Sequence, residues 1–364
     1  MKKILLTGGG TAGHVTPNLA LVPYLKEEGF EIEYMGSYEG IEKRLVEEAK
    51  IPYYGISSGK LRRYMDVKNL TDPARIIKGL FEARHYMKEQ KPDIVFSKGG
   101  FVSVPVIIAA SEYHIPIVIH ESDLSPGLAN KLSIPRATKV CYSFPETSQY
   151  LSHSKAVLTG LPVREELKRG SKEQGLKMCA FTASKPTLLV IGGSLGSVAV
   201  NKAVRSVLPE LLKTFSVIHI CGKDKMDPSL QDTEGYRQFE YVGEELPDLF
   251  AAADIVISRA GANVINELAA LRKPSLLIPL GTNASRGDQI LNADSFVRRG
   301  FAEVLHEEDL TSQSLLSKID SIYHNQDAFI SAMAAAEQGD AAQTVTRIIS
   351  EVLEEHQSHK KKSN

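Results

Sequence analysis

Short apolar runs alternate with longer amphipathic stretches along the whole chain. In the first half they predict strands at 3–7, 31–35, 52–56, 93–96, 116–120, 138–142 and 156–158, and helices at 15–28, 40–49, 73–90, 101–112 and 127–133. The second half repeats this, with strands at 187–191, 216–220, 239–242, 254–257, 275–278 and 302–304, and helices at 197–213, 246–252, 261–271, 286–299, 311–323 and 328–356. Continuous apolar strands that alternate with helices are typical of parallel sheets covered on both faces. The pattern therefore predicts an α/β fold with two doubly wound, Rossmann-like domains.

A glycine-rich loop follows the first strand of each half. The first loop spans residues 8–13 and the second spans residues 192–197. A strand, a glycine turn and a helix start together aim backbone N–H groups at a phosphate or another anion. Because ligands of such sheets bind beyond the carboxyl ends of the strands, we expect both loops to face a central cleft between the domains.

The composition is consistent with two globular domains and excludes some classes of partner. The chain has 364 residues, of which 43% are hydrophobic and 24% are charged, and its net charge is −1. This near-neutral balance gives no reason to expect a nucleic acid partner. The three cysteines are far apart, which is typical of a reducing cytoplasm. The sequence leads us to expect neither a signal peptide nor a membrane-spanning segment.

The first glycine loop resembles a dinucleotide site but lacks one part of it. Gly8, Gly10 and Gly13 match the G-x-G-x-x-G pattern, yet the following strand ends in Gly36-Ser37 instead of the acid that binds a ribose. His14 comes directly after the last glycine, at a predicted helix N-terminus, where the helix dipole favours the neutral imidazole. His14 is therefore a candidate general base. The alternative is that it only caps the helix or contacts a ligand.

The second half carries a candidate nucleotide site. Ser194 adds a hydroxyl to the amides of residues 192–197, as expected for a diphosphate cradle. Glu267 lies about two turns into the helix that Gly261 opens, where a carboxylate can accept hydrogen bonds from the two hydroxyls of a ribose. Gln289 follows a polar loop and suits sugar hydroxyls. Each feature has a structural alternative: the loop at 192–197 can be a plain tight turn, Glu267 a solvated helix residue, and Gln289 part of a helix cap.

Six segments in this order resemble the MurG family, the N-acetylglucosaminyltransferases of peptidoglycan synthesis. The segments are residues 8–17, 120–130, 159–164, 192–197, 259–267 and 288–289, and the resemblance covers essentially the whole chain. It implies the GT-B fold and an inverting transfer of GlcNAc from UDP-GlcNAc to the 4-hydroxyl of MurNAc in lipid I, giving lipid II. It also implies that residues 1–163 bind the lipid I acceptor and the membrane, with a helix at about 341–364 packing back on them. Residues 164–340 would bind UDP-GlcNAc.

The resemblance also implies roles for individual residues. The catalytic candidates are His14 and, second, Glu121. Four donor-binding candidates would contact the sugar end of the donor: Thr11, Ala12, Gly13 and Asn130. Arg164 would reach the donor from the domain junction. The remaining candidates are Ser194 for the diphosphate, Val242 for the uracil, Glu267 for the ribose, Gln289 for the GlcNAc hydroxyls, and Ala262. The chain departs from the family at Asp123, where many members carry Asn, so it has a carboxylate where those members have an amide.

The sequence contains no Asp-x-Asp pair of the type that holds a metal in other sugar-nucleotide enzymes. We therefore expect no tightly bound metal, with Mg²⁺ in solution as at most a stimulant.

A lipid acceptor requires contact with the membrane. Residues 60–91 carry nine basic and four acidic side chains, a net charge of +5, and their apolar residues recur at helical spacing: Ile76, Ile77, Leu80, Phe81 and Met87. A basic amphipathic helix is typical of binding to anionic lipid, although its apolar face can instead pack on the sheet. We therefore expect a peripheral protein on the cytoplasmic face of the cell membrane, with cell-wall synthesis and division proteins as candidate partners.

Three other functions share parts of this pattern. Another GT-B glycosyltransferase, acting on diacylglycerol or an antibiotic, would share the donor site and differ in the first half. A UDP-GlcNAc 2-epimerase would share the architecture and need no lipid. A UDP-sugar sensor would bind the donor without turnover and leave His14 and Glu121 without a role.

Overall fold

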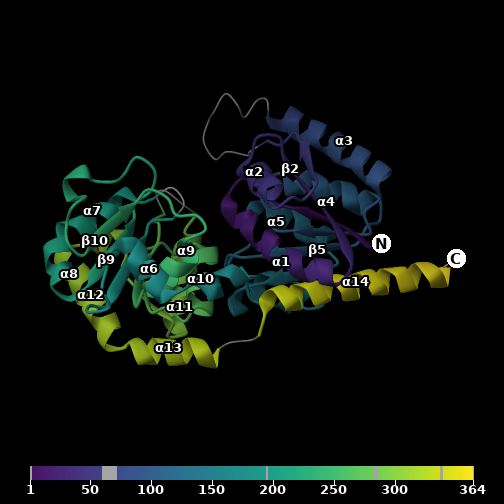
Figure 1. Cartoon of the computed structure of the whole chain (residues 1–364). Helices are drawn as coiled ribbons and strands as arrows, with labels where there is room; N and C mark the ends of the chain where they lie inside the picture. Colours follow the sequence, from purple (N-terminus) through teal and green to yellow (C-terminus); the bar gives the residue numbers. More distant parts are fainter. Residues whose placement is uncertain (1, 60–71, 194–195, 283–285, 337–338, 364) are drawn as a thin grey trace. The chain divides into compact units, whose positions relative to one another are not determined.

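The chain folds into two units, each built on one parallel sheet. The structure is a computed structural model, and it describes residues 2–59, 72–193, 196–282, 286–336 and 339–363. One unit comprises Met1–Arg164 with Gln338–Asn364, and the other comprises Glu165–Glu337. Helices surround the sheet in each unit (Figure 1). The predicted α/β fold with two Rossmann-like domains is confirmed.

Seven described strands form the sheet of the first unit, in the order β3-β2-β1-β4-β5-β6-β7. They are β1 (Lys2–Thr7), β2 (Phe30–Ser37), β3 (Tyr53–Ile56), β4 (Ile94–Ser97), β5 (Ile117–Glu121), β6 (Lys139–Tyr142) and β7 (Ala156–Leu158). The helices are α1 (Thr16–Glu27), α2 (Ile41–Glu48), α3 (Asp72–Gln90), α4 (Ser103–Glu112), α5 (Leu128–Ser133) and α14 (Ala341–Ser363). The connection order switches direction between β1 and β4, so their carboxyl ends flank the crevice where such sheets bind ligands.

Successive residues of each strand in this sheet pack on opposite faces. Ile4 and Leu6 of β1 are buried in one core cluster, with residues of α1 and α14. Leu5 is buried in the other cluster, with residues of α3 and α4. Because both faces are covered, β1, β4 and β5 carry runs of consecutive apolar residues instead of alternating apolar and polar ones.

The last helix of the chain belongs to the first unit. α14 lies along α1 (Figure 1), and its Val345 and Ile349 share a core with Leu21. The predicted single helix at 328–356 is wrong, because two helices occupy this region. Gly339, at φ +84°, interrupts it, and Asp340 Oδ1 accepts a hydrogen bond from the N–H of Ala342 at 2.7 Å, which caps the new helix.

Six described strands form the sheet of the second unit, in the order β10-β9-β8-β11-β12-β13. They are β8 (Thr187–Ile191), β9 (Ser216–Ile220), β10 (Tyr236–Phe239), β11 (Ile255–Ser258), β12 (Ser275–Leu277) and β13 (Ala302–Val304). The helices are α6 (Lys172–Cys179), α7 (Val198–Ser206), α8 (Leu208–Thr214), α9 (Leu246–Ala252), α10 (Ala262–Ala270), α11 (Asp288–Arg298), α12 (Ser312–His324) and α13 (Gln326–Ala335). The switch point lies between β8 and β11.

Two predicted elements of this unit are corrected by the structure. The strand expected at 239–242 is β10, which begins and ends three residues earlier. The buried Tyr236 pairs with Val217, and its hydroxyl forms a hydrogen bond with His219 Nδ1 at 2.8 Å. The helix expected at 197–213 is two helices, because Pro209 cannot continue α7 and lies instead in the first turn of α8. Within the described part of the chain, no helix has the length and apolar character needed to cross a membrane.

Candidate active site

Two loops pack tightly at the carboxyl edge of the first sheet. Residues 8–13 follow β1 and residues 98–102 follow β4. The N–H of Gly9 donates to the carbonyl of Gly99 at 3.3 Å. A Cβ on Gly100, which has φ +84°, would overlap the backbone of Gly9. The glycines therefore allow the two backbones to approach each other at the switch point.

His14 lies directly after the first loop. It ends a 3₁₀ turn (Ala12–His14) that leads into α1, and its Nδ1 lies 3.0 Å from the carbonyl oxygen of Gly9 and 3.1 Å from Thr11 Oγ1. Because a carbonyl oxygen can only accept, Nδ1 carries the proton of the neutral ring and Nε2 holds the lone pair. This is the tautomer in which Nε2 can act as a general base.

Glu121, the second candidate base, holds a loop in place. It ends β5, is buried, and accepts hydrogen bonds from the N–H groups of Asp123 and Gly127 at 3.0 Å each and from Asn130 Nδ2 at 2.8 Å. Burial and the nearby Asp123 charge raise the pKa of the Glu121 carboxyl above its usual value. Since both carboxylate oxygens are engaged in fixing the loop after β5, the geometry favours His14 as the base.

Lys98, directly after β4, was missed by the sequence analysis. Its side chain is 1% exposed, and its Nζ donates to His120 Nδ1 at 2.9 Å and to Ser122 Oγ. His120 Nε2 lies 2.8 Å from the carbonyl of Gly160, so Nε2 carries the proton and Nδ1 is the acceptor for Lys98. Burial lowers the pKa of Lys98 to about 8 and that of His120 well below its usual value. A single lysine after a strand has no sequence signature, because only the fold places it beside β5.

Replacing Lys98 with methionine is expected to change how stability depends on pH. The pKa of Lys98 is lowered from 10.5 to about 8, so between these values the folded protein has released a proton that the unfolded chain still binds. The Lys98 contribution to the free energy of unfolding therefore rises with pH in this window, by at most about 1.4 kcal/mol per pH unit. Urea unfolding of both proteins across the window measures this rise. A stability difference that is independent of pH would contradict the prediction.

The second unit has its own glycine loop, between β8 and α7. Gly193 and Gly196 have φ values of +86° and +69°, and Ser197 Oγ caps α7 by accepting from the N–H of Val200 at 3.3 Å. The loop thus leads straight into a helix N-terminus, which favours an anion. The predicted diphosphate ligand Ser194 lies outside the described residues.

Arg259 ties this loop to the neighbouring strands. Its guanidinium is buried and donates to Ser197 Oγ at 2.7 Å, to the carbonyl of Ile278 at 3.0 Å, and to Glu307 at 2.6 Å. Arg259 therefore joins the start of α7, the end of β12 and the segment after β13. The two terminal nitrogens of Arg259 therefore hold the loop in place.

The other predicted donor residues lie around the same edge of the second sheet. Ala262 is the first residue of α10 and Glu267 lies in its second turn. Gln289 is in the first turn of α11, where its Oε1 accepts from the N–H of Leu280 at 3.0 Å. Val242 lies beyond the end of β10, in the segment before α9. The remaining donor candidates belong to the first unit: Thr11, Ala12, Gly13, Asn130 and Arg164.

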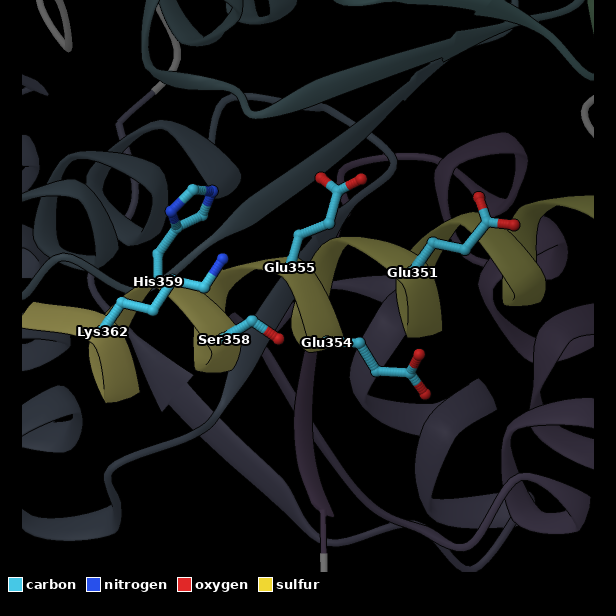
Figure 2. A pocket seen from close by; sticks show the side chains of 6 residues that line it. All are labelled: Glu351, Glu354, Glu355, Ser358, His359 and Lys362. Atoms are coloured by element: carbon cyan, nitrogen blue, oxygen red, sulfur yellow. The ribbon is translucent and has the colours of Figure 1, made fainter.

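A pocket elsewhere in the first unit is not part of this site. Figure 2 shows side chains from successive turns of α14, and its lining residues are Glu351, Glu354, Glu355, Ser358, His359 and Lys362. None of the predicted site residues lines it. Among the described residues, no group of three or more His, Cys, Asp or Glu side chains is placed to hold a metal ion.

Comparison with known proteins identifies the family. Residues 4–142 match the glycosyltransferase family 28 N-terminal domain, and residues 187–352 match its C-terminal domain. A relative from Lachnospira eligens, named UDP-N-acetylglucosamine--N-acetylmuramyl-(pentapeptide) pyrophosphoryl-undecaprenol N-acetylglucosamine transferase, is 61% identical over 96% of this chain and 99% of its own length. A relative of the same name from Clostridium botulinum strain Langeland is 56% identical over the same shares. MurG from Acinetobacter baumannii aligns with a TM-score of 0.77 at 27% identity, over 96% of this chain and 100% of that chain.

The chain belongs to the MurG family. The resemblance stated from its motifs is confirmed, and so is the GT-B fold. The protein is therefore an enzyme of the glycosyltransferase class.

One feature of this MurG-family chain explains why its first glycine loop is not a dinucleotide site. The N–H of Gly10 donates to Glu42 Oε2 at 3.1 Å, and a Cβ on Gly9 would lie 2.5 Å from the same carboxyl group. Glu42 is fully buried. The Glu42 carboxylate thus accepts the hydrogen bond from the Gly10 N–H that a bound phosphate would otherwise accept. Glu42 has no sequence signature, because it lies on α2, 32 residues after Gly10.

Proposed function

We propose that this chain is an inverting glycosyltransferase that moves GlcNAc from UDP-GlcNAc to the 4-hydroxyl of MurNAc in lipid I, which yields lipid II for peptidoglycan synthesis. The observation that carries the proposal is the 61% identity to an N-acetylglucosamine transferase of that substrate class, over nearly the full length of both chains. Because the donor is α-linked and the product is β-linked, a single displacement at the anomeric carbon accounts for the inversion.

In the first unit, we assign the deprotonation of the acceptor hydroxyl to His14. Nε2 of His14 takes the proton of the acceptor hydroxyl as the new glycosidic bond forms. Thr11, Ala12 and Gly13 contact the sugar end of the donor. Asn130 supports a sugar contact as well, because its buried Oδ1 has no hydrogen-bond partner among the described residues while its Nδ2 holds Glu121.

In the second unit, the proposal assigns the donor and the leaving group. The amides of residues 192–197 and the N-terminus of α7 stabilise the charge that develops on the departing diphosphate, with Arg164 of the first unit as a further cation. Glu267 accepts from the ribose hydroxyls, Val242 offers its backbone to the uracil, and Gln289 contacts the GlcNAc hydroxyls. Ala262 is the first residue of α10, the helix that carries Glu267. We also propose that the transfer uses no tightly bound metal and that Mg²⁺ at most stimulates it.

Release of UDP from UDP-GlcNAc tests this function, measured with and without a lipid I analogue. UDP release that depends on the acceptor, with a β-1,4-linked disaccharide product, is the expected result. Conversion of the sugar nucleotide without an acceptor would instead indicate a UDP-GlcNAc 2-epimerase. Donor binding without turnover would indicate a sensor, and turnover with diacylglycerol but not lipid I would indicate another lipid glycosyltransferase.

We further propose that the enzyme associates with the cytoplasmic face of the cell membrane through α3. Leu80 and Met87 pack in the core, whereas Ile77 and Phe81 are 57% and 61% exposed, one helical turn apart. The side chains of Arg75, Lys78 and Lys88 are exposed on the same helix. Exposed apolar residues among cations suit the surface of an anionic bilayer. Residues 60–71, which complete the predicted basic stretch, lie outside the described residues. Binding to proteins of cell-wall synthesis and division stays a prediction.

Replacing Ile77 and Phe81 together with aspartate is expected to weaken binding to anionic vesicles at least about 10-fold, because two apolar side chains no longer enter the bilayer and two negative charges are added. Vesicle sedimentation at low salt measures the affinity. Val297→Asp, at an exposed apolar position of the second unit, is the control and should bind like the parent. Equal binding by all three proteins would refute a membrane role for α3.

A further inference from the structure

A single peptide group connects His14 to a buried carboxylate. The carbonyl of Gly9 accepts from His14 Nδ1 at 3.0 Å, and the N–H of Gly10 donates to Glu42 Oε2 at 3.1 Å. These two groups are the two ends of the same peptide bond. We propose that Glu42 is a positioning residue that acts on His14 through the Gly9–Gly10 peptide.

The surroundings of Glu42 hold its carboxylate in one place. Its Oε1 accepts from both the N–H and the Oγ of Ser37, and its side chain is fully buried at the start of α2. Gly36 and Gly40 leave the space it occupies, because a Cβ on either would overlap the Glu42 side chain. The chain therefore builds a specific site for this carboxylate, and one of its donors is the peptide that His14 contacts.

The peptide transmits two effects to His14. A carboxylate on the N–H end polarises the peptide and makes its carbonyl oxygen a stronger acceptor, because hydrogen bonds in a chain strengthen one another. The stronger acceptor keeps the proton on Nδ1 and the lone pair on Nε2. When Nε2 takes a proton, the negative charge at the far end of the peptide stabilises the imidazolium that forms.

The other titratable groups around Glu42 are identifiable. Tyr34 on β2 donates to the carbonyl of Gly8 at 2.8 Å, and Tyr53 on β3 donates to the carbonyl of Ser37 at 2.5 Å. Burial raises the pKa of both hydroxyls far above their usual values, so both stay neutral. Glu47 is the other carboxylate of α2 that acts on Tyr53, and its side chain is exposed. Glu42 is thus the buried carboxylate that is connected to His14 through the Gly9–Gly10 peptide, a connection called the peptide relay below.

Nitrogen NMR of the histidine side chains tests the proposal without any need for turnover. Glu42→Gln keeps the size of the side chain and removes its charge, and Glu47→Gln removes the same charge from an exposed position of the same helix. The titration midpoint of His14, assigned by its loss in His14→Asn, is expected to fall by about half a pH unit or more in Glu42→Gln and to stay in place in Glu47→Gln. Equal midpoints in all three proteins would overturn the proposal, whatever reaction the enzyme catalyses.

A kinetic cycle provides the second test and rests on the proposed transferase function. Glu42→Gln is expected to lower kcat roughly 10-fold and to shift the acidic limb of the pH–rate profile to lower pH, with no such change in Glu47→Gln. In a His14→Asn background, Glu42→Gln should have no further effect on kcat, because the relay already lacks its base. An equal loss in both backgrounds would mean that Glu42 only supports the fold. If the parent enzyme shows no acceptor-dependent UDP release, the proposed function is wrong. The NMR titration would still show whether Glu42 acts on His14 through the peptide.

Discussion

Replacing His14 with asparagine is expected to lower kcat roughly 10²–10⁴-fold while the affinity for UDP-GlcNAc stays close to that of the parent. The Nδ2 of asparagine can take the place of His14 Nδ1 and donate to the carbonyl of Gly9, which lies 3.0 Å away in the structure. The variant therefore keeps the hydrogen bond and lacks the basic Nε2. Steady-state kinetics with a lipid I analogue, together with calorimetric titration of the donor, measure the two quantities.

An exposed histidine of the same unit provides the control for this change. His85 lies on α3 with an exposed side chain, and His85→Asn should leave kcat unchanged. Near-normal turnover in His14→Asn would exclude His14 as the base. Glu121 would then be the remaining candidate base.

Replacing Gly196 with alanine is expected to lower the free energy of unfolding by roughly 3 kcal/mol or more and to abolish donor binding. The φ of Gly196 is +69°, and a Cβ there would overlap the carbonyl oxygen of Cys221, a backbone atom that cannot turn away. Asn201 Nδ2 holds the same carbonyl at 2.9 Å. The start of α7 must therefore shift away from the end of β9, which disturbs the anion site proposed there. Urea unfolding and calorimetric titration of UDP-GlcNAc measure both effects.

Gly193 is the matched control in the same loop. Its φ is +86°, yet a Cβ there would meet no atom within 4 Å. Gly193→Ala is therefore expected to cost only the backbone strain, about 1–2 kcal/mol. If both variants lost the same stability, close packing on Cys221 would not be the reason for a glycine at position 196.

Most of the fold was predictable because its signals are local. A strand buried on both faces must be apolar at every position, as Ile4, Leu5 and Leu6 are, whatever its neighbours. The errors also have local causes. Pro209 and the Gly339-Asp340 pair are helix-boundary signals that the periodicity of the surrounding residues masked. The start of β10 was missed because it depends on Tyr236 packing beside His219, which is a contact between strands.

The candidate site was predictable only in part. His14 and the glycine loops were found because a strand, a glycine turn and a helix start follow one another in the chain. Lys98 and Arg259 were overlooked as organisers of the two loops, since their partners lie 19 to 62 residues away in sequence. No pattern within a short window distinguishes such residues from solvated ones.

The sequence by itself determined the two parallel α/β units, the glycine loops after their first strands and the glycosyltransferase family, because these depend on local patterning and on the order of motifs. The tertiary structure alone decided which polar groups meet at the carboxyl edge of each sheet. It placed Glu42 on the peptide that His14 contacts, and it used Glu121 to hold a loop instead of leaving its carboxylate open. The physical reason is that a buried charge takes its role from the donors that surround it, and strand order brings those donors from distant parts of the chain.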